Sequence, residues 1–214
     1  MMPRITLLHG WGYDADLWRH VLPLLTDLDV EVADLGYFGA RIPPMSCAAP
    51  RIAVGHSLGA MWWLALADQP WQRLVAINGF ARFTATADFP DGVAPRVLER
   101  MRKQFAVKPQ QVLTDFQAAC GGSGPALPSD TSSLAQGLDL LVATDGRAAL
   151  AGRSTDVWAL AARNDAIVPA AMSAAAFAAL PEYRLRWIAD GDHLLPLSHP
   201  QECAQLICAA VAWR

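Results

Sequence analysis

Short apolar runs alternate with stretches of helical periodicity along most of this chain. The first run covers residues 5–8, and apolar positions at helical spacing follow it over residues 16–28. Such alternation predicts an α/β fold, with a mostly parallel sheet of about six strands and helices on both faces. The expected strands are residues 4–9, 30–34, 52–55, 74–78, 156–161 and 184–188, with helices over 16–28, 58–68 and 200–213.

The alternation stops after the fourth expected strand and resumes only near residue 154. Prolines punctuate this stretch, a glycine-rich loop covers residues 121–124, and helical pieces are expected over 97–105 and 109–120. An insertion at this point would lie over the carboxyl ends of the strands and act as a lid. The alternative is a structural excursion packed to one side. The expected division is a core of residues 1–79 and 154–214 with a helical lid of residues 80–153.

The link between the second and third strands is short and rich in proline. It covers residues 36–50 and contains Pro43, Pro44 and Pro50. These prolines argue against a full crossover helix in this link.

The pentapeptide Gly55-His56-Ser57-Leu58-Gly59 stands between an apolar run and a stretch of strong helix formers. Strand, tight turn and helix form the context that G-x-S-x-G requires as a nucleophile elbow. Side chains at either glycine would collide with the neighbouring strand and helix, because the serine occupies a strained turn. The motif predicts a serine hydrolase with Ser57 as its nucleophile.

A serine nucleophile needs a base, and five histidines are available. His193 lies in the loop that leaves the last expected strand, where a base is expected. His199 precedes a proline at a helix start, which suggests capping or surface exposure. His56 lies on the wrong side of the elbow turn, and His20 lies on the first expected helix.

The base in turn needs an orienting acid. Asp165 lies in the loop after strand 156–161, so it shares one edge of the sheet with His193. Asp190 and Asp192 are nearer to His193 in sequence, but neighbours in one loop rarely reach the side-on geometry that holds an imidazole. Asp34 precedes the elbow in the chain. For Asp165 the alternative role is capping of the next helix.

The tetrahedral intermediate requires two preorganised N–H donors. The backbone of Leu58 follows the nucleophile at a helix N-terminus, where the helix dipole adds to its effect. The second donor is expected from Trp11 in His9-Gly10-Trp11-Gly12, the loop after the first strand. His9 is expected to brace this loop.

Composition narrows the class of protein without changing this picture. The chain is 53% hydrophobic and 17% charged, with 17 basic and 20 acidic residues, which argues against a disordered or nucleic-acid-binding protein. No apolar run is long enough for a membrane span, and the early first strand argues against a signal peptide. The four cysteines lack metal-like spacing, so no metal or cofactor is expected and a reduced, cytoplasmic setting is predicted. Cys203 and Cys208 are interpreted as small core residues of the last helix.

These motifs together resemble the α/β-hydrolase superfamily, which implies the α/β-hydrolase fold. More narrowly, several stretches are similar to the pimeloyl-[acyl-carrier protein] methyl ester esterases of biotin synthesis. The similar stretches are residues 9–12, 137–141 with 145–147, 164–169 and 193–200.

The resemblance implies Ser57 as nucleophile, His193 as base and Asp165 as orienting acid, with Trp11 and Leu58 as oxyanion hole. The implied reaction is hydrolysis of the methyl ester on a pimeloyl chain carried by acyl-carrier protein, through an acyl-enzyme. The protein is expected to be a monomer. The expected lining of the acyl tunnel is Trp11, Leu58, Phe80, Phe83 and Leu194, each of which could instead be ordinary core.

Acyl-carrier protein is strongly acidic, so a basic cluster in the lid is the expected docking face. Gln111 and Asp115 occupy positions where the family presents basic residues. A solvated helix face is the alternative for the basic cluster. Its members are Arg96, Arg100, Arg102, Lys103 and Lys108.

Two other functions remain as alternatives. One is a general esterase or thioesterase for small acyl groups. The other is a hydrolase-like receptor that keeps its triad but mainly binds a small ligand.

Overall fold

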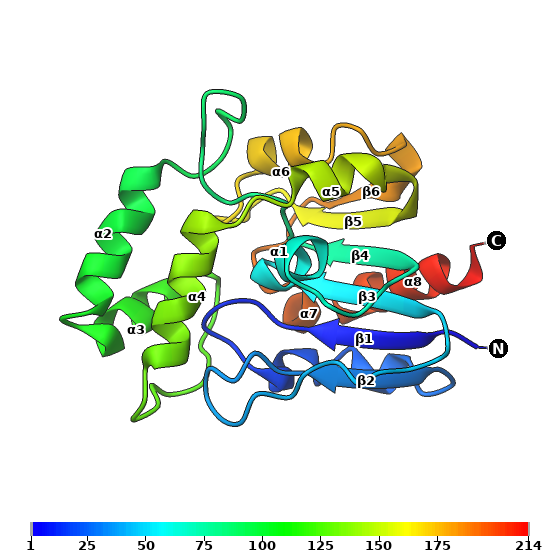
Figure 1. The fold of residues 1–214 in the computed structure, drawn as a ribbon, viewed down its shortest axis with the longest axis horizontal. Coiled ribbons are helices and arrows are strands. Elements are labelled where there is room, and N and C mark those ends of the chain that lie inside the picture. The colour runs from blue at the N-terminus through cyan, green and yellow to red at the C-terminus, as the bar shows by residue number, and fades with distance from the viewer. Residues whose placement is uncertain (1, 214) are drawn as a thin grey trace.

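The computed structural model describes residues 2–213, and its centre is one sheet of six parallel strands (Figure 1). The strand order is β2-β1-β3-β4-β5-β6. Every strand end lies within one residue of its prediction, because the apolar runs extend over most of each strand. The strands are β1 (Arg4–Leu8), β2 (Asp29–Ala33), β3 (Arg51–His56), β4 (Arg73–Ile77), β5 (Val157–Ala162) and β6 (Leu185–Ile188).

Both faces of the sheet are covered, as the apolar character of the strands requires. Successive residues of one strand point to opposite faces, so Ala53 belongs to one buried cluster while Ile52 and Val54 belong to the other. The first cluster packs under α1 (Leu58–Ala65) and α6 (Ala170–Ala176), and the second packs under α7 (Leu195–Ser198) and α8 (Pro200–Ala212). Figure 1 shows α1 and α8 on opposite sides of the sheet.

The predicted helix over residues 16–28 is wrong. Two short 3₁₀ helices, Ala15–Trp18 and Leu22–Leu24, replace it. Pro23 lies inside the predicted helix, where it removes a backbone donor and clashes with the preceding turn. The apolar pattern is nevertheless used, since Leu17 and Val21 are buried on the sheet.

The elbow helix is also shorter than expected, because α1 ends at Ala65 rather than near residue 68. Cys208 on α8 is exposed, which corrects its interpretation as a core residue, whereas Cys203 is fully buried as expected. No helix formed by residues 2–213 combines the length and the apolar character that a membrane crossing needs.

The link between β2 and β3 contains no helix within residues 36–50, as its prolines predict. Buried Arg51 fastens this link to the sheet. Its guanidinium pairs with Glu31 at 2.6 Å and also donates to the Thr6 hydroxyl and the backbone carbonyl of Met45. An ion pair with further hydrogen bonds thus anchors the link where a crossover helix is absent.

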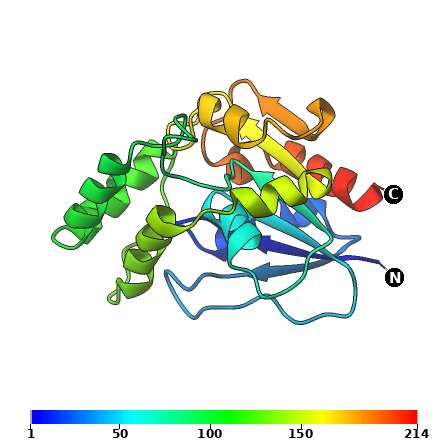
Figure 2. The ribbon, with the colours of Figure 1, turned by 45° about the horizontal axis from the view of Figure 1, so that its top comes forward.

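The residues after β4 form helices that stand beyond the carboxyl ends of the strands (Figures 1 and 2). These are α2 (Pro95–Phe105), α3 (Pro109–Ala119) and α4 (Ser132–Ala143). The fourth, α5 (Arg147–Gly152), packs against α1 of the core. The entry and exit of the insertion are tied together, because Arg82 forms an ion pair of 2.8 Å with Asp145.

Candidate active site

Ser57 occupies the sharp turn between β3 and α1, with φ 53° and ψ −123°. A positive φ is unfavourable for serine, so the surrounding backbone has to hold this conformation. Two glycines make the turn possible. A Cβ on Gly55 would lie 2.3 Å from the amide nitrogen of Ala60, and one on Gly59 would lie 2.5 Å from the carbonyl oxygen of Leu8.

His193 and Asp165 meet where the loops after β6 and β5 adjoin. The Nδ1 of His193 lies 2.7 Å from Oδ2 of Asp165, and both side chains are almost completely buried. The other carboxylate oxygen of Asp165 accepts hydrogen bonds of 2.8 Å from the backbone N–H groups of Ile167 and Val168. The carboxylate is therefore held from two sides and favours the imidazole tautomer that carries its proton on Nδ1.

That tautomer leaves a lone pair on Nε2 of His193. This nitrogen is buried and has no hydrogen-bond partner within residues 2–213. No hydrogen bond joins it to the Ser57 hydroxyl in the same part of the chain. A catalytic hydrogen bond is often long in the absence of substrate.

The other acidic candidates have different partners. The side chain of Asp190 is exposed, and Asp192 accepts a hydrogen bond of 3.0 Å from the Leu194 backbone N–H. Asp34 lies 3.1 Å from the Nε2 of His9. Of the four carboxylates considered from the sequence, the structure brings Asp165 to His193.

The loop after β1 passes directly beside Ser57. A Cβ on Gly10 would lie 2.7 Å from the Cβ of Ser57, so only glycine permits this approach. Across residues 2–213, neither Trp11 nor Leu58 donates its backbone N–H to a protein acceptor. Two unsatisfied donors next to a serine elbow provide the chemistry that an oxyanion hole needs.

His9 braces this loop, as expected from the sequence. Its Nε2 accepts a hydrogen bond of 3.0 Å from the Leu35 backbone, and its Nδ1 lies 2.8 Å from the carbonyl oxygen of Gly10.

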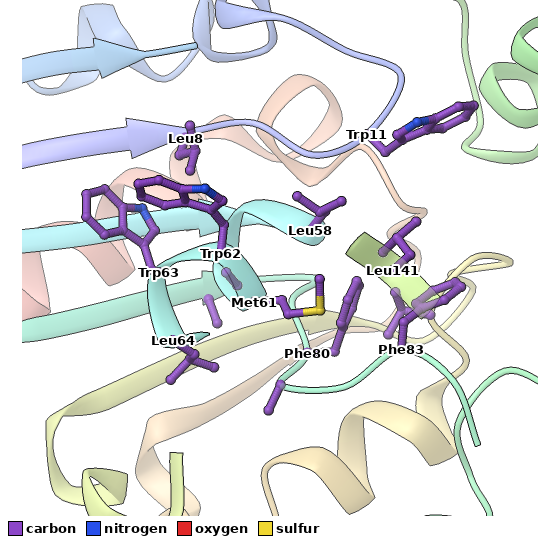
Figure 3. Close-up of a cluster of buried hydrophobic side chains, with 14 of the residues drawn as sticks. Leu8, Trp11, Leu58, Met61, Trp62, Trp63, Leu64, Phe80, Phe83 and Leu141 are labelled. Atoms are coloured by element: carbon purple, nitrogen blue, oxygen red, sulfur yellow. The ribbon is translucent and has the colours of Figure 1, made fainter. Parts of the chain in front are cut away.

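Four of the five residues predicted to line an acyl tunnel belong to one apolar cluster. Figure 3 shows Trp11, Leu58, Phe80 and Phe83 in this cluster. The rings of Phe80 and Phe83 are 5.0 Å apart. The fifth residue, Leu194, belongs to the cluster on the other face of the sheet and is not brought together with them.

Leu141 of α4 is not among the lining residues expected from the sequence. It lies near Phe83 in Figure 3 and is buried in the same cluster. The available signal was its place in the stretch 137–141.

The predicted basic cluster is largely brought together by α2 and α3. These helices line a groove of about 610 Å³ that includes Arg96, Arg100, Lys103 and Lys108. Arg102 is not part of it, because its guanidinium pairs with Asp139 of α4 at 2.5 Å. Two further lining residues, Gln111 and Asp115, are hydrogen-bonded to each other at 2.7 Å.

Two other polar residues contact the His193 loop and were not assigned roles from the sequence. His56, inside the elbow motif, and Asn78, directly after β4, both lie within hydrogen-bond distance of the His193 carbonyl oxygen.

Burial raises the pKa of the Tyr13 phenol and of the Cys120 thiol, so both remain uncharged. Over residues 2–213, no three His, Cys, Asp or Glu side chains are grouped to hold a metal ion.

Comparisons with known proteins identify the family of this chain. A model of the alpha/beta hydrolase family matches residues 25–206. The pimeloyl-[acyl-carrier protein] methyl ester esterase of Aromatoleum aromaticum is 31% identical over 241 residues, covering 96% of this chain and 96% of that protein. The biotin biosynthesis bifunctional protein BioHC of Cellvibrio japonicus is 30% identical, and the match covers 94% of this chain but 46% of that longer protein.

Among solved structures, an esterase from Exiguobacterium antarcticum superposes with a TM-score of 0.81. The match covers 99% of this chain and 92% of the esterase, at 15% identity. Such a likeness shows a shared fold.

Proposed function

This chain belongs to the alpha/beta hydrolase family, and we propose that it is a serine carboxylesterase that hydrolyses the methyl ester of pimeloyl-[acyl-carrier protein] in biotin biosynthesis. The buried His193–Asp165 pair carries the catalytic part of this proposal, because it leaves a basic nitrogen free at the edge of the sheet that holds the Ser57 elbow. The choice of substrate is supported by the names of the relatives.

The first half of the reaction transfers the acyl group to Ser57. The hydroxyl proton moves to Nε2 of His193 while Oγ attacks the ester carbonyl carbon. The negative charge that develops on the carbonyl oxygen is stabilised by the N–H groups of Trp11 and Leu58. Collapse of the intermediate breaks the bond to the methoxy oxygen, which takes the proton from Nε2 and leaves as methanol.

In the second half, His193 takes a proton from water as the water oxygen attacks the acyl-enzyme. The bond between the acyl carbon and Ser57 Oγ breaks, and Oγ recovers its proton from Nε2. Asp165 stabilises the imidazolium that forms in both halves. The products are the free pimeloyl carboxylate on its carrier and the regenerated enzyme.

Access to this site requires movement of the insertion. Ser57 is 5% exposed, and the buried apolar cluster that contains Trp11 and Phe80 also includes side chains of α2, α3 and α4. We therefore assign the helices α2, α3 and α4 the role of a lid that opens for the acyl chain.

The groove between α2 and α3 is the proposed docking face for the acidic carrier. It presents Arg96, Arg100, Lys103 and Lys108. A second cavity of about 340 Å³ shares Arg100 with this groove and extends to Phe116. The Phe116 ring lies 4.8 Å from that of Trp11, so the cavities lead from the charged surface toward the oxyanion loop.

Turnover tests the catalytic proposal. Purified enzyme is expected to release methanol repeatedly from methyl pimeloyl-carrier protein and to hydrolyse a p-nitrophenyl ester, with both activities lost in Ser57→Ala. Turnover of the small ester alone would favour a general esterase or thioesterase. Binding of esters without Ser57-dependent turnover would favour a receptor. Size-exclusion chromatography tests the accompanying expectation of a monomer.

Charge reversal tests the docking face. Arg96→Glu combined with Arg100→Glu is expected to raise KM for the carrier-bound ester by at least about tenfold and leave the p-nitrophenyl ester unaffected. The matched control reverses exposed Arg41 and Arg186, which lie outside the insertion and make the same change in net charge. Equal effects of the two double variants would refute the docking face but leave the esterase assignment intact.

A further inference from the structure

The backbone carbonyl of His193 accepts two side-chain hydrogen bonds. The Nε2 of His56 donates to it at 2.8 Å, and the Nδ2 of Asn78 donates to it at 3.0 Å. Asn78 Nδ2 also lies 2.8 Å from the carbonyl oxygen of the preceding residue, Asp192. His56, Asn78 and His193 are each no more than 1% exposed, so these bonds form away from water.

The two donors come from the rigid centre of the sheet. His56 is the last residue of β3, and Asn78 directly follows β4. The amide oxygen of Asn78 accepts a further bond of 2.8 Å from the N–H of Ala162, the last residue of β5. The loop that carries His193 leaves β6, yet its backbone is bonded to residues at the ends of β3 and β4 and, through the Asn78 side chain, linked to the end of β5.

We propose that His56 and Asn78 are positioning residues that hold the His193 backbone, so that Nε2 of its ring is aimed at Ser57 during both halves of the reaction. This inference rests on the esterase function proposed above. Asp165 holds the ring at Nδ1, but one hydrogen bond at one ring atom does not fix the point from which the side chain projects. The hydrogen bonds from His56 and Asn78 to the His193 carbonyl supply a second point of attachment, on the backbone.

The protonation state of His56 follows from its partner. A carbonyl oxygen only accepts, so Nε2 of His56 carries a proton, while its Nδ1 is buried without a partner within residues 2–213. Burial, together with the nearby His193, lowers the pKa of His56 well below its usual value. Its ring centroid is 4.8 Å from that of His193, so a neutral His56 avoids like-charge repulsion when His193 becomes an imidazolium.

Asn78 suits its position by conformation as well as by chemistry. Its φ is 44°, in the left-handed region that asparagine tolerates better than most residues. Its carboxamide donates to two carbonyl groups and accepts from one N–H. An aspartate has the same shape but would present an oxygen to both carbonyl groups, whereas glycine keeps the backbone conformation and removes every side-chain bond.

Paired substitutions separate positioning from folding. The amide nitrogen of glutamine can occupy the place of Nε2 of His56, whereas that of asparagine matches Nδ1. His56→Leu, His56→Asn and Asn78→Asp are each expected to lower kcat for a p-nitrophenyl ester by about 10- to 100-fold with KM within twofold. His56→Gln is expected to restore kcat to within about threefold of the parent enzyme. Asn78→Gly removes the side-chain amide but keeps the backbone conformation, so its kcat measures the effect of losing the amide bonds alone.

The control is Val75→Ala on β4, a fully buried core position away from the His193 carbonyl. It is expected to lower Tm through a cavity while keeping kcat. Positioning is refuted if His56→Leu and Asn78→Asp retain kcat, or if His56→Gln and His56→Asn lose it equally. A parent enzyme without Ser57-dependent turnover would instead overturn the esterase function and this inference together.

Discussion

The replacement Asp165→Asn is the sharpest test of how the candidate site works. One carboxylate oxygen of Asp165 accepts from the backbone N–H groups of Ile167 and Val168, and the other faces Nδ1 of His193. In the variant, the single amide oxygen has to stay with the two N–H donors. The amide nitrogen then lies opposite Nδ1 of His193 and donates to it, which moves the ring proton to Nε2.

Rotation of the new amide would restore an acceptor for His193 but leave two N–H groups, that of Val168 buried and that of Ile167 partly buried, facing an NH₂ group. An unsatisfied buried donor costs about 1–3 kcal/mol, so the Val168 group alone disfavours the rotated form by that amount and the Ile167 group adds to it. The productive tautomer is therefore rare. A loss of about 10⁴-fold in kcat is expected, equivalent to about 5.5 kcal/mol in the activation barrier.

The assay is steady-state hydrolysis of a p-nitrophenyl ester, with Tm measured in parallel to establish that the variant is folded. Asp192→Asn is the matched control, because it keeps the oxygen that accepts from the Leu194 N–H. Its kcat is expected to stay near that of the parent enzyme. Asp165→Asn with kcat within tenfold of the parent, or an inactive and folded Asp192→Asn, would refute the assignment of Asp165.

Two further predictions follow from particular contacts. Gly10→Ala places a Cβ 2.7 Å from that of Ser57 and moves the Trp11 N–H out of line, so kcat of the folded variant is expected to fall about 100-fold in the same ester assay, with a lower Tm from the crowding; unchanged kcat would argue against Trp11 as a donor. The hydrogen bonds from Arg147 lower the pKa of Asp145 in the folded protein, so its contribution to stability is present above the unfolded pKa of about 3.9 and is lost as the pH falls. Asp145→Asn is thus expected to lower Tm at pH 7 and to lower it progressively less as the pH falls below about 3.9, and an equal decrease at pH 7 and near pH 2.5 would refute this linkage.

The core of the fold was predictable because its signals are local. The buried strands β1, β3, β4 and β5 are nearly continuous apolar runs, and every predicted strand end lies within one residue of the observed end. The meeting of Asp165 with His193 was also predictable, because the carboxyl ends of neighbouring parallel strands share an edge of the sheet. The need for glycine at both ends of the elbow was predictable as well, because a Cβ at either position would collide with nearby backbone atoms.

The errors have equally local physical causes. The prediction over residues 16–28 followed the apolar spacing and neglected Pro23. The chain instead forms two 3₁₀ helices in this region, where Leu17, Val21 and Leu25 are buried but Leu24 is exposed. The helix α4 was not predicted, although Leu134, Leu138 and Leu141 recur at helical spacing and are buried. Its boundaries are obscured by the surrounding proline- and glycine-rich segments.

Contacts between residues that are far apart in the sequence had no local signal in it. Arg102 follows Arg100 in sequence and belongs to the same helix, but it faces Asp139 of α4 rather than the basic groove. The hydrogen bonds from His56 and Asn78 to the His193 carbonyl likewise join residues more than one hundred positions apart. Charge and spacing in a sequence identify candidates, whereas the packing of helices decides which partner each candidate meets.

Trp11 shows most clearly what such packing adds. From the sequence, its backbone N–H is predicted to belong to the oxyanion hole and its ring is predicted to line the acyl tunnel. In the structure, the indole nitrogen donates to the carbonyl oxygen of Leu134 at 2.7 Å, and the ring packs edge-on against Phe105 and Phe116. A Cβ on Gly137 would lie 2.6 Å from the indole, so α4 approaches as closely as glycine permits. Separation of α2, α3 and α4 from the core must therefore break contacts of Trp11, the residue after Gly10, and this couples the position of the insertion to the geometry of the loop beside Ser57.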